Sequence, residues 1–161
     1  EQEIDVLWSH QDQPIAQHML VMIYTGMRPA EILSMQKENI HLSEHYMTGG
    51  VKTKKSKARK IIIPDRIQDI IRQMLDASDS AKLSTFKKHA FYDAWWLFRA
   101  ACGLRDELTP YCCRHTYITM LTALKVSPAM LQELAGHEDY DTTLEYTHLS
   151  VQDRLNEVNR L

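Results

Sequence analysis

Arg28 occupies an unusual position for a positive charge. It lies between Thr25-Gly26-Met27, which is typical of a helix end, and Pro29, which suits the first turn of a new helix. A cation at a helix N-terminus opposes the helix dipole, whereas an anion held there by Arg28 and free backbone N–H groups is stabilised. The position indicates an anion site, although a surface arginine in a mildly unfavourable place would give the same sequence.

A second arginine, Arg114, stands in the segment Thr109-Pro-Tyr-Cys-Cys-Arg-His-Thr-Tyr117. The helix expected here is apolar enough to be packed, with Tyr111, Ile118 and Leu121 near the arginine. A packed helix rarely turns an arginine inward without an anionic partner. The partner is either a ligand or an acidic side chain of the same protein.

The segment Lys52-Thr-Lys-Lys-Ser-Lys-Ala-Arg-Lys60 holds six cations in nine residues. Clustered cations of this kind can neutralise several phosphates of a nucleic acid. The net charge of −2 and the pI near 6.5 argue against a nucleic-acid binder, but residues 28–75 carry ten basic and five acidic side chains. The segment is therefore either a phosphate-contacting finger or a solvated turn.

Two histidines and two tyrosines lie in the polar segment Gly136-His-Glu-Asp-Tyr-Asp-Thr-Thr-Leu-Glu-Tyr-Thr-His148. Functional residues concentrate in such segments when a rigid scaffold holds them. Taken singly, His137 and Tyr146 are more often core or surface residues than catalysts. Neither decides a function without the other groups.

The elements that position these residues are predicted to be mainly helical. The expected helices cover 14–24, 29–36, 65–75, 86–102, 111–125, 127–134, a short piece at 141–147, and 151–161; residues 76–85 form a loop. Two β-prone runs, 46–51 and 59–64, flank the basic segment as an antiparallel hairpin. The fold class is mainly α with a small antiparallel hairpin.

Composition excludes several classes of protein. The 161 residues are 44% hydrophobic and 25% charged, which is typical of one globular domain. The longest aliphatic run, Ile61-Ile62-Ile63, is far too short to cross a bilayer. Three cysteines without paired spacing predict neither a disulfide framework nor a metal site, so we expect no bound metal and a cytoplasmic location.

Taken together and in order, these segments resemble the catalytic domain of tyrosine recombinases, the phage and transposon integrase family. The matching stretches are Tyr24-Thr-Gly-Met-Arg-Pro-Ala-Glu-Ile-Leu33, Gly49-Gly-Val-Lys-Thr53, residues 59–64, residues 109–117, Leu134-Ala-Gly-His137 and Thr142-Thr-Leu-Glu-Tyr-Thr-His148. His137 precedes Tyr146 by nine positions, as in the family. The chain looks most like integrases of conjugative transposons from Gram-positive bacteria.

The resemblance implies a role for each matching residue. Tyr146 is the expected nucleophile, which attacks the scissile DNA phosphate and forms a 3′-phosphotyrosyl link. Arg28 and Arg114 are expected to bind the non-bridging oxygens, since a guanidinium suits fixed phosphoryl oxygens. Lys52 is the expected general acid and His137 a further hydrogen-bond donor to the phosphate.

Other residues take supporting roles in this resemblance. Glu31 looks like the family's acid that orients an active-site group, and Tyr111 stands where the family usually has histidine. A phenol donates a hydrogen bond but is a poor base near neutral pH, so Tyr111 is expected to bind phosphate. The remaining basic residues of the hairpin, expected to contact DNA, are Lys54, Lys55, Lys57, Arg59 and Lys60. Neither ATP nor any other cofactor is implied.

The resemblance also implies partners. Double-stranded DNA is the expected substrate, with other protomers in a DNA-bound tetramer. Residues 1–161 are expected to form a single catalytic domain, with the family's N-terminal core-binding and arm-binding domains absent from this chain. The apolar face of the helix at 151–161 either packs on its own domain or docks on a neighbouring protomer.

Three alternatives remain at this point. A type IB topoisomerase shares the constellation but relaxes DNA, and a DNA-binding module of the same fold could be catalytically silent. A metal-dependent hydrolase using His137 and His148 would need a metal for activity. The Leu-Ala-Gly-His motif and the spacing of His137 and Tyr146 favour the recombinase.

Overall fold

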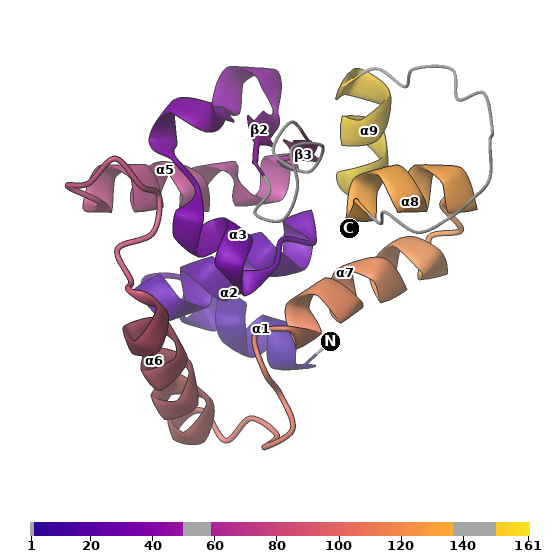
Figure 1. The fold of residues 1–161 in the computed structure, drawn as a ribbon. Helices are drawn as coiled ribbons and strands as arrows, with labels where there is room; N and C mark the ends of the chain where they lie inside the picture. The colour runs from indigo at the N-terminus through magenta and orange to yellow at the C-terminus, as the bar shows by residue number, and fades with distance from the viewer. Residues whose placement is uncertain (1, 50–58, 137–150) are drawn as a thin grey trace.

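Helix α2 (Pro14–Thr25) lies at the centre of the molecule. In this computed structural model, which describes residues 2–49, 59–136 and 151–161 except for the side chains of 152 and 153, every residue of α2 after Pro14 is buried. A helix that is buried all round belongs to the core. It packs against α1 (Gln2–Ser9), α5 (Gln68–Ala77), α6 (Lys88–Ala101) and α7 (Cys112–Ala123) (Figure 1).

The other described helices are short. They are α3 (Pro29–Ser34), α8 (Pro128–Ala135) and α9 (Val151–Val158), with 3-10 turns at Lys37–Asn39, Leu42–Glu44 and Asp65–Ile67. The predicted helices are thus present, with ends that differ by a few residues. The N-terminal helix α1 was not predicted, and the short helix expected at 141–147 lies outside the described residues. None of the described helices is long and apolar enough to span a membrane.

A three-stranded antiparallel sheet stands beside these helices, in the order β1 (Ile40–His41), β2 (Tyr46–Thr48) and β3 (Lys60–Ile62). The predicted hairpin is confirmed as β2 and β3, with Met47 opposite Ile61, although both strands are shorter than expected. The two-residue strand β1 was not predicted. Beyond the ladder, the Gly49 N–H donates to the Arg59 carbonyl at 3.2 Å, which continues the pairing toward the basic segment.

A second, smaller apolar cluster joins β3 to the C-terminal helices. Its buried members are Ile62, Tyr117, Leu121, Val126, Met130, Leu134, Leu155 and Val158. Leu155 and Val158 are the apolar face of α9, and they are 5% and 0% exposed. In this structure the face that could have docked on another protomer packs on its own domain. Figure 1 shows α9 next to α8 and β3, far from α6.

Candidate active site

The turn between α2 and α3 is built on Gly26. This glycine ends α2 in the left-handed region at φ +68, and its N–H donates to the Met22 carbonyl at 2.9 Å. A side chain here would also collide with the core, because a Cβ on Gly26 would lie 2.5 Å from Cδ1 of Tyr117. Only glycine fits both requirements, and the sharp turn presents the Gly26 carbonyl to the neighbouring helix α7.

Arg28 stands directly before α3 and is paired with Glu31. The Arg28 N–H donates to Oε2 of Glu31 at 2.7 Å, and its Nη1 lies 3.7 Å from Oε1. Glu31 is only 4% exposed, whereas the Arg28 side chain is 42% exposed. The buried carboxylate fixes the backbone of Arg28 and offsets its charge against the helix dipole. Glu31 therefore contacts both the backbone N–H and the guanidinium of Arg28.

Arg114 points inward from the first turns of α7. It is 9% exposed, and its Nη1 donates to the Gly26 carbonyl at 2.8 Å, so the arginine is held on the turn that precedes Arg28. Its Nη2 is buried and has no hydrogen-bond partner among the described residues. Burial, followed by the charges of Arg28 and Arg59, lowers the pKa of Arg114 to about 10. The acidic partner that was one explanation of Arg114 is not seen: its described partner is a carbonyl.

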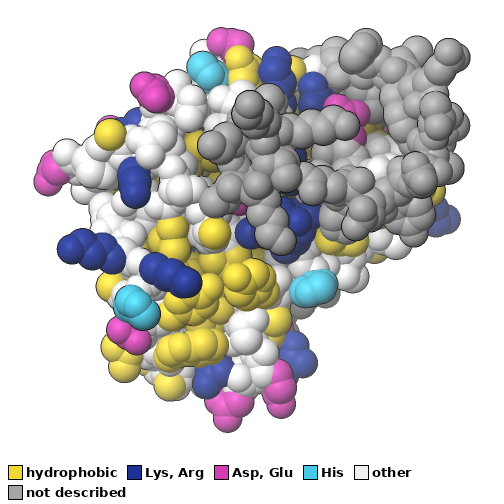
Figure 2. Space-filling model, in the orientation of Figure 1, with side chains coloured by type: hydrophobic (Ala, Val, Ile, Leu, Met, Phe, Trp, Pro, Cys, Tyr) yellow, Lys and Arg dark blue, Asp and Glu magenta, His cyan; other side chains and the backbone are white. Residues whose placement is uncertain are grey.

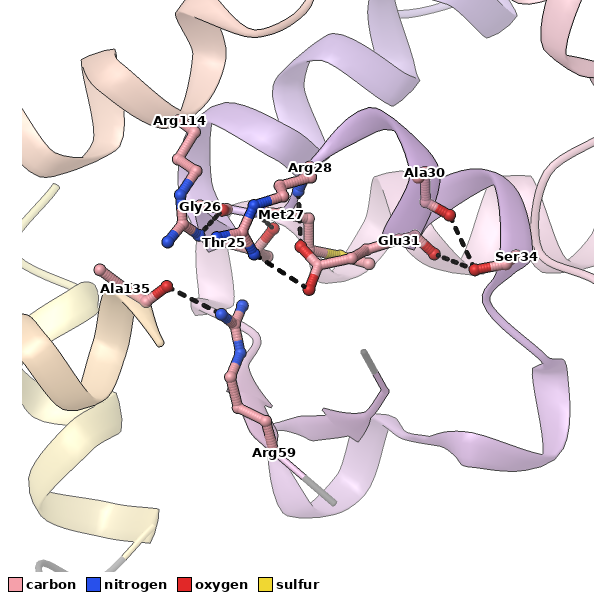
Figure 3. A network of polar contacts seen from close by, with 10 residues as sticks. All are labelled: Thr25, Gly26, Met27, Arg28, Ala30, Glu31, Ser34, Arg59, Arg114 and Ala135. Atoms are coloured by element: carbon pink, nitrogen blue, oxygen red, sulfur yellow. Dashed lines mark hydrogen bonds and ion pairs between the residues drawn. The ribbon is translucent and has the colours of Figure 1, made fainter. Parts of the chain in front are cut away.

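Arg59, directly before β3, belongs to the same cluster. Its Nη1 donates to the Ala135 carbonyl at the end of α8 at 2.8 Å, and its Nε and Nη2 are buried without a described partner. Burial lowers the pKa of Arg59, the charge of Arg28 lowers it further and Glu31 opposes them. Figure 3 shows the guanidinium groups of Arg28, Arg59 and Arg114 directed toward one another, with Glu31 beside them.

From the sequence, Arg59 was expected only to be one of the basic residues of the hairpin that contact DNA. The alternation of side chains along a strand does not separate it from them. Arg59 shares one strand face with Ile61 and Ile63, and Lys60 shares the other with Ile62. All three isoleucines are buried, at 1%, 0% and 3% exposed for Ile61, Ile63 and Ile62. Lys60 is exposed and stands 4.3 Å above the ring of Tyr46. Of these two neighbours, Arg59 faces the arginine cluster and Lys60 faces outward.

Tyr111 immediately precedes α7 and is 53% exposed. No hydrogen bond joins it to any of the three arginines within the described ranges. It lines a cavity of about 590 Å³ next to α3 and the start of α6, together with Tyr92 and three lysines, Lys82, Lys87 and Lys88. Burial, then a hydrogen bond with Tyr111, raises the pKa of Tyr92. Figure 2 shows apolar side chains over this part of the surface, flanked by Lys and Arg.

The remaining predicted site residues lie outside the described residues. They are Lys52, Lys54, Lys55 and Lys57 in 50–58, and His137 and Tyr146 in 137–150. The residues that flank these segments are nevertheless in contact, because Arg59, directly after the first segment, donates to the carbonyl of Ala135, two residues before the second. No group of His, Cys, Asp or Glu that could hold a metal ion occurs in the described part of the chain.

Known proteins resemble this chain in sequence. Residues 2–153 match the phage integrase family. The chain is 29% identical to the tyrosine recombinase XerD of Lacticaseibacillus casei in an alignment of 146 positions, which covers 82% of this chain and 49% of that protein. It is 30% identical to XerA of Saccharolobus solfataricus over 138 residues, which are 85% and 46%. The chain thus spans about half the length of the curated relatives it matches.

Solved structures share the fold. The Tn1549 transposon integrase in complex with circular intermediate DNA has a TM-score of 0.74 at 16% identity, covering 94% of this chain and 61% of that one. The XerA recombinase has a TM-score of 0.72 at 21% identity, covering 93% and 59%. The predicted fold class, mainly helical with a small antiparallel sheet, is confirmed. On the family match, this chain belongs to the phage integrase family.

Proposed function

We propose that this chain is the catalytic domain of a site-specific tyrosine recombinase that cuts and rejoins double-stranded DNA during integration and excision of a mobile element. The observation that carries the proposal is the joining of two arginines on one turn. Arg114 donates to the Gly26 carbonyl. Arg28 follows Gly26 by two residues, and its backbone N–H donates to the Glu31 carboxylate. Buried guanidinium N–H groups without a partner are costly, and a phosphate would satisfy them.

The proposed reaction uses residues inside and outside the described ranges. Tyr146 loses its phenolic proton to solvent, and the phenolate attacks the scissile phosphorus. A bond forms between the tyrosine oxygen and phosphorus, and the bond from phosphorus to the 5′ oxygen breaks. Lys52 gives its proton to that oxygen, so that a 5′-hydroxyl leaves.

Arg28 and Arg114 bind the non-bridging oxygens throughout this step. Their positive charges stabilise the pentacoordinate transition state more than the ground state, because the transition state carries more negative charge. Since the cluster is already formed, the arginines need not reorganise when the reaction occurs. His137 and Tyr111 donate further hydrogen bonds in this proposal. The 5′-hydroxyl of a partner strand then attacks the phosphotyrosine phosphorus and returns its proton to Lys52. The bond from phosphorus to the tyrosine oxygen breaks, and the released Tyr146 phenolate takes a proton from solvent. Because the phosphodiester energy is kept in the tyrosyl bond, the exchange needs no ATP.

Partners follow from the same proposal. The basic hairpin residues contact the DNA backbone, which positions the duplex without reading its sequence. Strand exchange requires four active sites on two duplexes, so the chain acts in a DNA-bound tetramer. The apolar face of α9 packs on its own domain here. To contact another protomer in the tetramer, α9 must therefore either leave this packing or use its outer face.

The test is capture of the covalent intermediate. The chain is incubated in EDTA with a library of nicked duplexes of randomised sequence, and DNA that remains bound after denaturation is recovered and sequenced. We expect recovery of a preferred sequence joined through a 3′-phosphate, lost in Tyr146→Phe and retained in the matched control Tyr140→Phe. A topoisomerase would show little sequence preference, and a silent DNA-binding module would give no adduct. An adduct that persists in Tyr146→Phe overturns the assignment of the nucleophile.

A further inference from the structure

Arg59 lies in the proposed phosphate site although it was expected only to touch the DNA backbone. It enters from the sheet, whereas Arg28 and Arg114 come from the helical layer around α2. The charge of Arg28 acts on both Arg59 and Arg114, and the charge of Arg59 acts on Arg114. Three guanidinium groups from distant parts of the chain thus share one place (Figure 3).

The orientation of Arg59 leaves one edge of its guanidinium free. Nη1 is used by the Ala135 carbonyl, while Nε and Nη2 have no described partner and are buried. Nε and Nη2 form the side of the guanidinium that can donate two parallel hydrogen bonds to two oxygens of a phosphate. The bond to Ala135 fixes the group, so little side-chain entropy remains to be lost when an anion binds.

Gly136 makes this position possible. A Cβ on Gly136 would lie 2.0 Å from Nη1 of Arg59 and 2.6 Å from its Cδ, so any side chain would displace the arginine. The glycine also adopts φ +64, where it ends α8. The close approach places Arg59 against the residue that directly precedes His137 in the sequence.

Charge balance favours an anion at this point. Three guanidinium groups face a single described carboxylate, Glu31, and burial lowers the pKa of both Arg59 and Arg114. A cluster with this excess of positive charge is unfavourable when empty. A phosphodiester brings one negative charge, and its pentacoordinate transition state brings a second, which the extra cation stabilises preferentially.

We propose that Arg59 is a third phosphate ligand of this site, which donates through Nε and Nη2 to the scissile phosphate while Nη1 holds the end of α8. This inference rests on the proposed function and deepens it. It separates Arg59 from the other basic residues of the hairpin, which contact flanking phosphates. Loss of Arg59 therefore reduces the rate of the chemical step rather than DNA affinity alone.

The test compares two substrates that differ only at the scissile phosphate. The recovered target duplex is made with a phosphodiester or with a methylphosphonate, in which a neutral methyl group replaces one non-bridging oxygen. Arg59→Met is expected to slow adduct formation on the phosphodiester by about 100-fold or more at saturating chain. On the methylphosphonate, whose transition state carries one negative charge less, the loss should fall below about tenfold.

Two further variants complete this test. Arg59→Lys keeps the charge without the two-pronged edge, so it should lose an intermediate amount, and it carries the comparison if Arg59→Met does not fold. Arg72→Met, at an exposed arginine of α5, is the control and should match the unsubstituted chain on both substrates.

Equal losses on the two substrates, or no loss on either, overturn the inference while leaving the Tyr146 adduct of the unsubstituted chain intact. Absence of any Tyr146-dependent adduct from the unsubstituted chain overturns the proposed function, and the role of Arg59 with it.

Discussion

Arg114 is held by the carbonyl of Gly26, through a hydrogen bond of 2.8 Å from its Nη1. This bond connects the first turns of α7 to the turn that ends α2 and leads to Arg28. The arrangement gives Gly26 two functions, since its left-handed conformation ends the helix and its carbonyl anchors the second arginine. The geometry of the candidate site therefore depends on a residue that has no reactive side chain.

Replacement of Arg114 should lower activity strongly while changing the free energy of unfolding little. Burial and the charges of Arg28 and Arg59 disfavour the charged form of Arg114, as its lowered pKa shows. Arg114→Met removes that repulsion and loses one hydrogen bond, so we expect the free energy of unfolding to stay within about 1 kcal/mol of the unsubstituted chain. Adduct formation should fall by at least about 100-fold.

Urea unfolding and covalent capture measure the two quantities for Arg114→Met. Arg72→Met serves as the exposed control and should change neither. A loss of several kcal/mol in unfolding free energy would show that Arg114 is chiefly a structural residue.

Alanine at Gly26 should destabilise the fold more than alanine at another left-handed glycine. Gly26 has φ +68 and a Cβ position 2.5 Å from the Tyr117 ring, whereas Gly103 has φ +63 with no atom within 4 Å of its Cβ position. Gly103→Ala should cost about 1 kcal/mol from the backbone conformation alone. Gly26→Ala adds overpacking, for a total of about 2–4 kcal/mol by urea unfolding. Equal losses at the two positions would contradict the tight packing of Gly26 on Tyr117.

Local signals in the sequence predicted the helices well. Ser127, Pro128 and Gly136 bound α8 as expected, because the cap is made within the segment: Ser127 Oγ accepts from the Met130 N–H at 3.3 Å. The start of α6 was misplaced by two residues. Ser84 Oγ accepts a hydrogen bond from the Phe86 N–H at 3.1 Å. Because this local bond competes with a helical turn, the helix begins only at Lys88.

Non-local relationships were not predictable from the sequence in the same way. The strand β1 exists only through its pairing with β2, so two residues without a pattern of their own could not indicate it. Arg59 stood in a run of cations, and its position depends on Ala135, far along the chain. The types and order of Arg28, Glu31 and Arg114 led to the hypothesis of a phosphate site, whereas the hydrogen bond from Arg114 to the Gly26 carbonyl could be seen only in the fold.

Acid should weaken the fold through His18. This side chain is 2% exposed, bonded through Nδ1 to the Pro14 carbonyl at 2.6 Å and through Nε2 to Ser84 Oγ at 2.8 Å. Burial lowers the pKa of His18 to about 4 from an ordinary 6.5. Between these values the unfolded chain binds more protons, so stability falls as the pH decreases from 6.5 to 4. Neutral His18 accounts for on the order of 3 kcal/mol of the free energy of unfolding. This amount is fully present above pH 6.5 and is lost as the pH falls toward 4.

The measurement for His18 is urea unfolding at pH 7.5, 5.5 and 4.5. His18→Gln lacks the titrating group, so the stability difference between it and the unsubstituted chain should change with pH by the amount that His18 contributes. The exposed His89 supplies the control, and His89→Gln should leave the pH profile unchanged. If the difference between His18→Gln and the unsubstituted chain is constant from pH 7.5 to 4.5, His18 is not held neutral by burial.

The packing of α9 on its own domain can be tested by truncating one leucine. Leu155 is 5% exposed within the cluster that contains Ile62 and Tyr117, whereas Leu97 on α6 is 73% exposed. Leu155→Ala should lower the free energy of unfolding by about 2–4 kcal/mol, and Leu97→Ala should change it by less than about 0.5 kcal/mol. Because the contact is within one chain, the urea midpoint should be the same across a hundredfold range of chain concentration. A midpoint that rises with concentration, and no longer does so in Leu155→Ala, would show that α9 docks on a second protomer in solution.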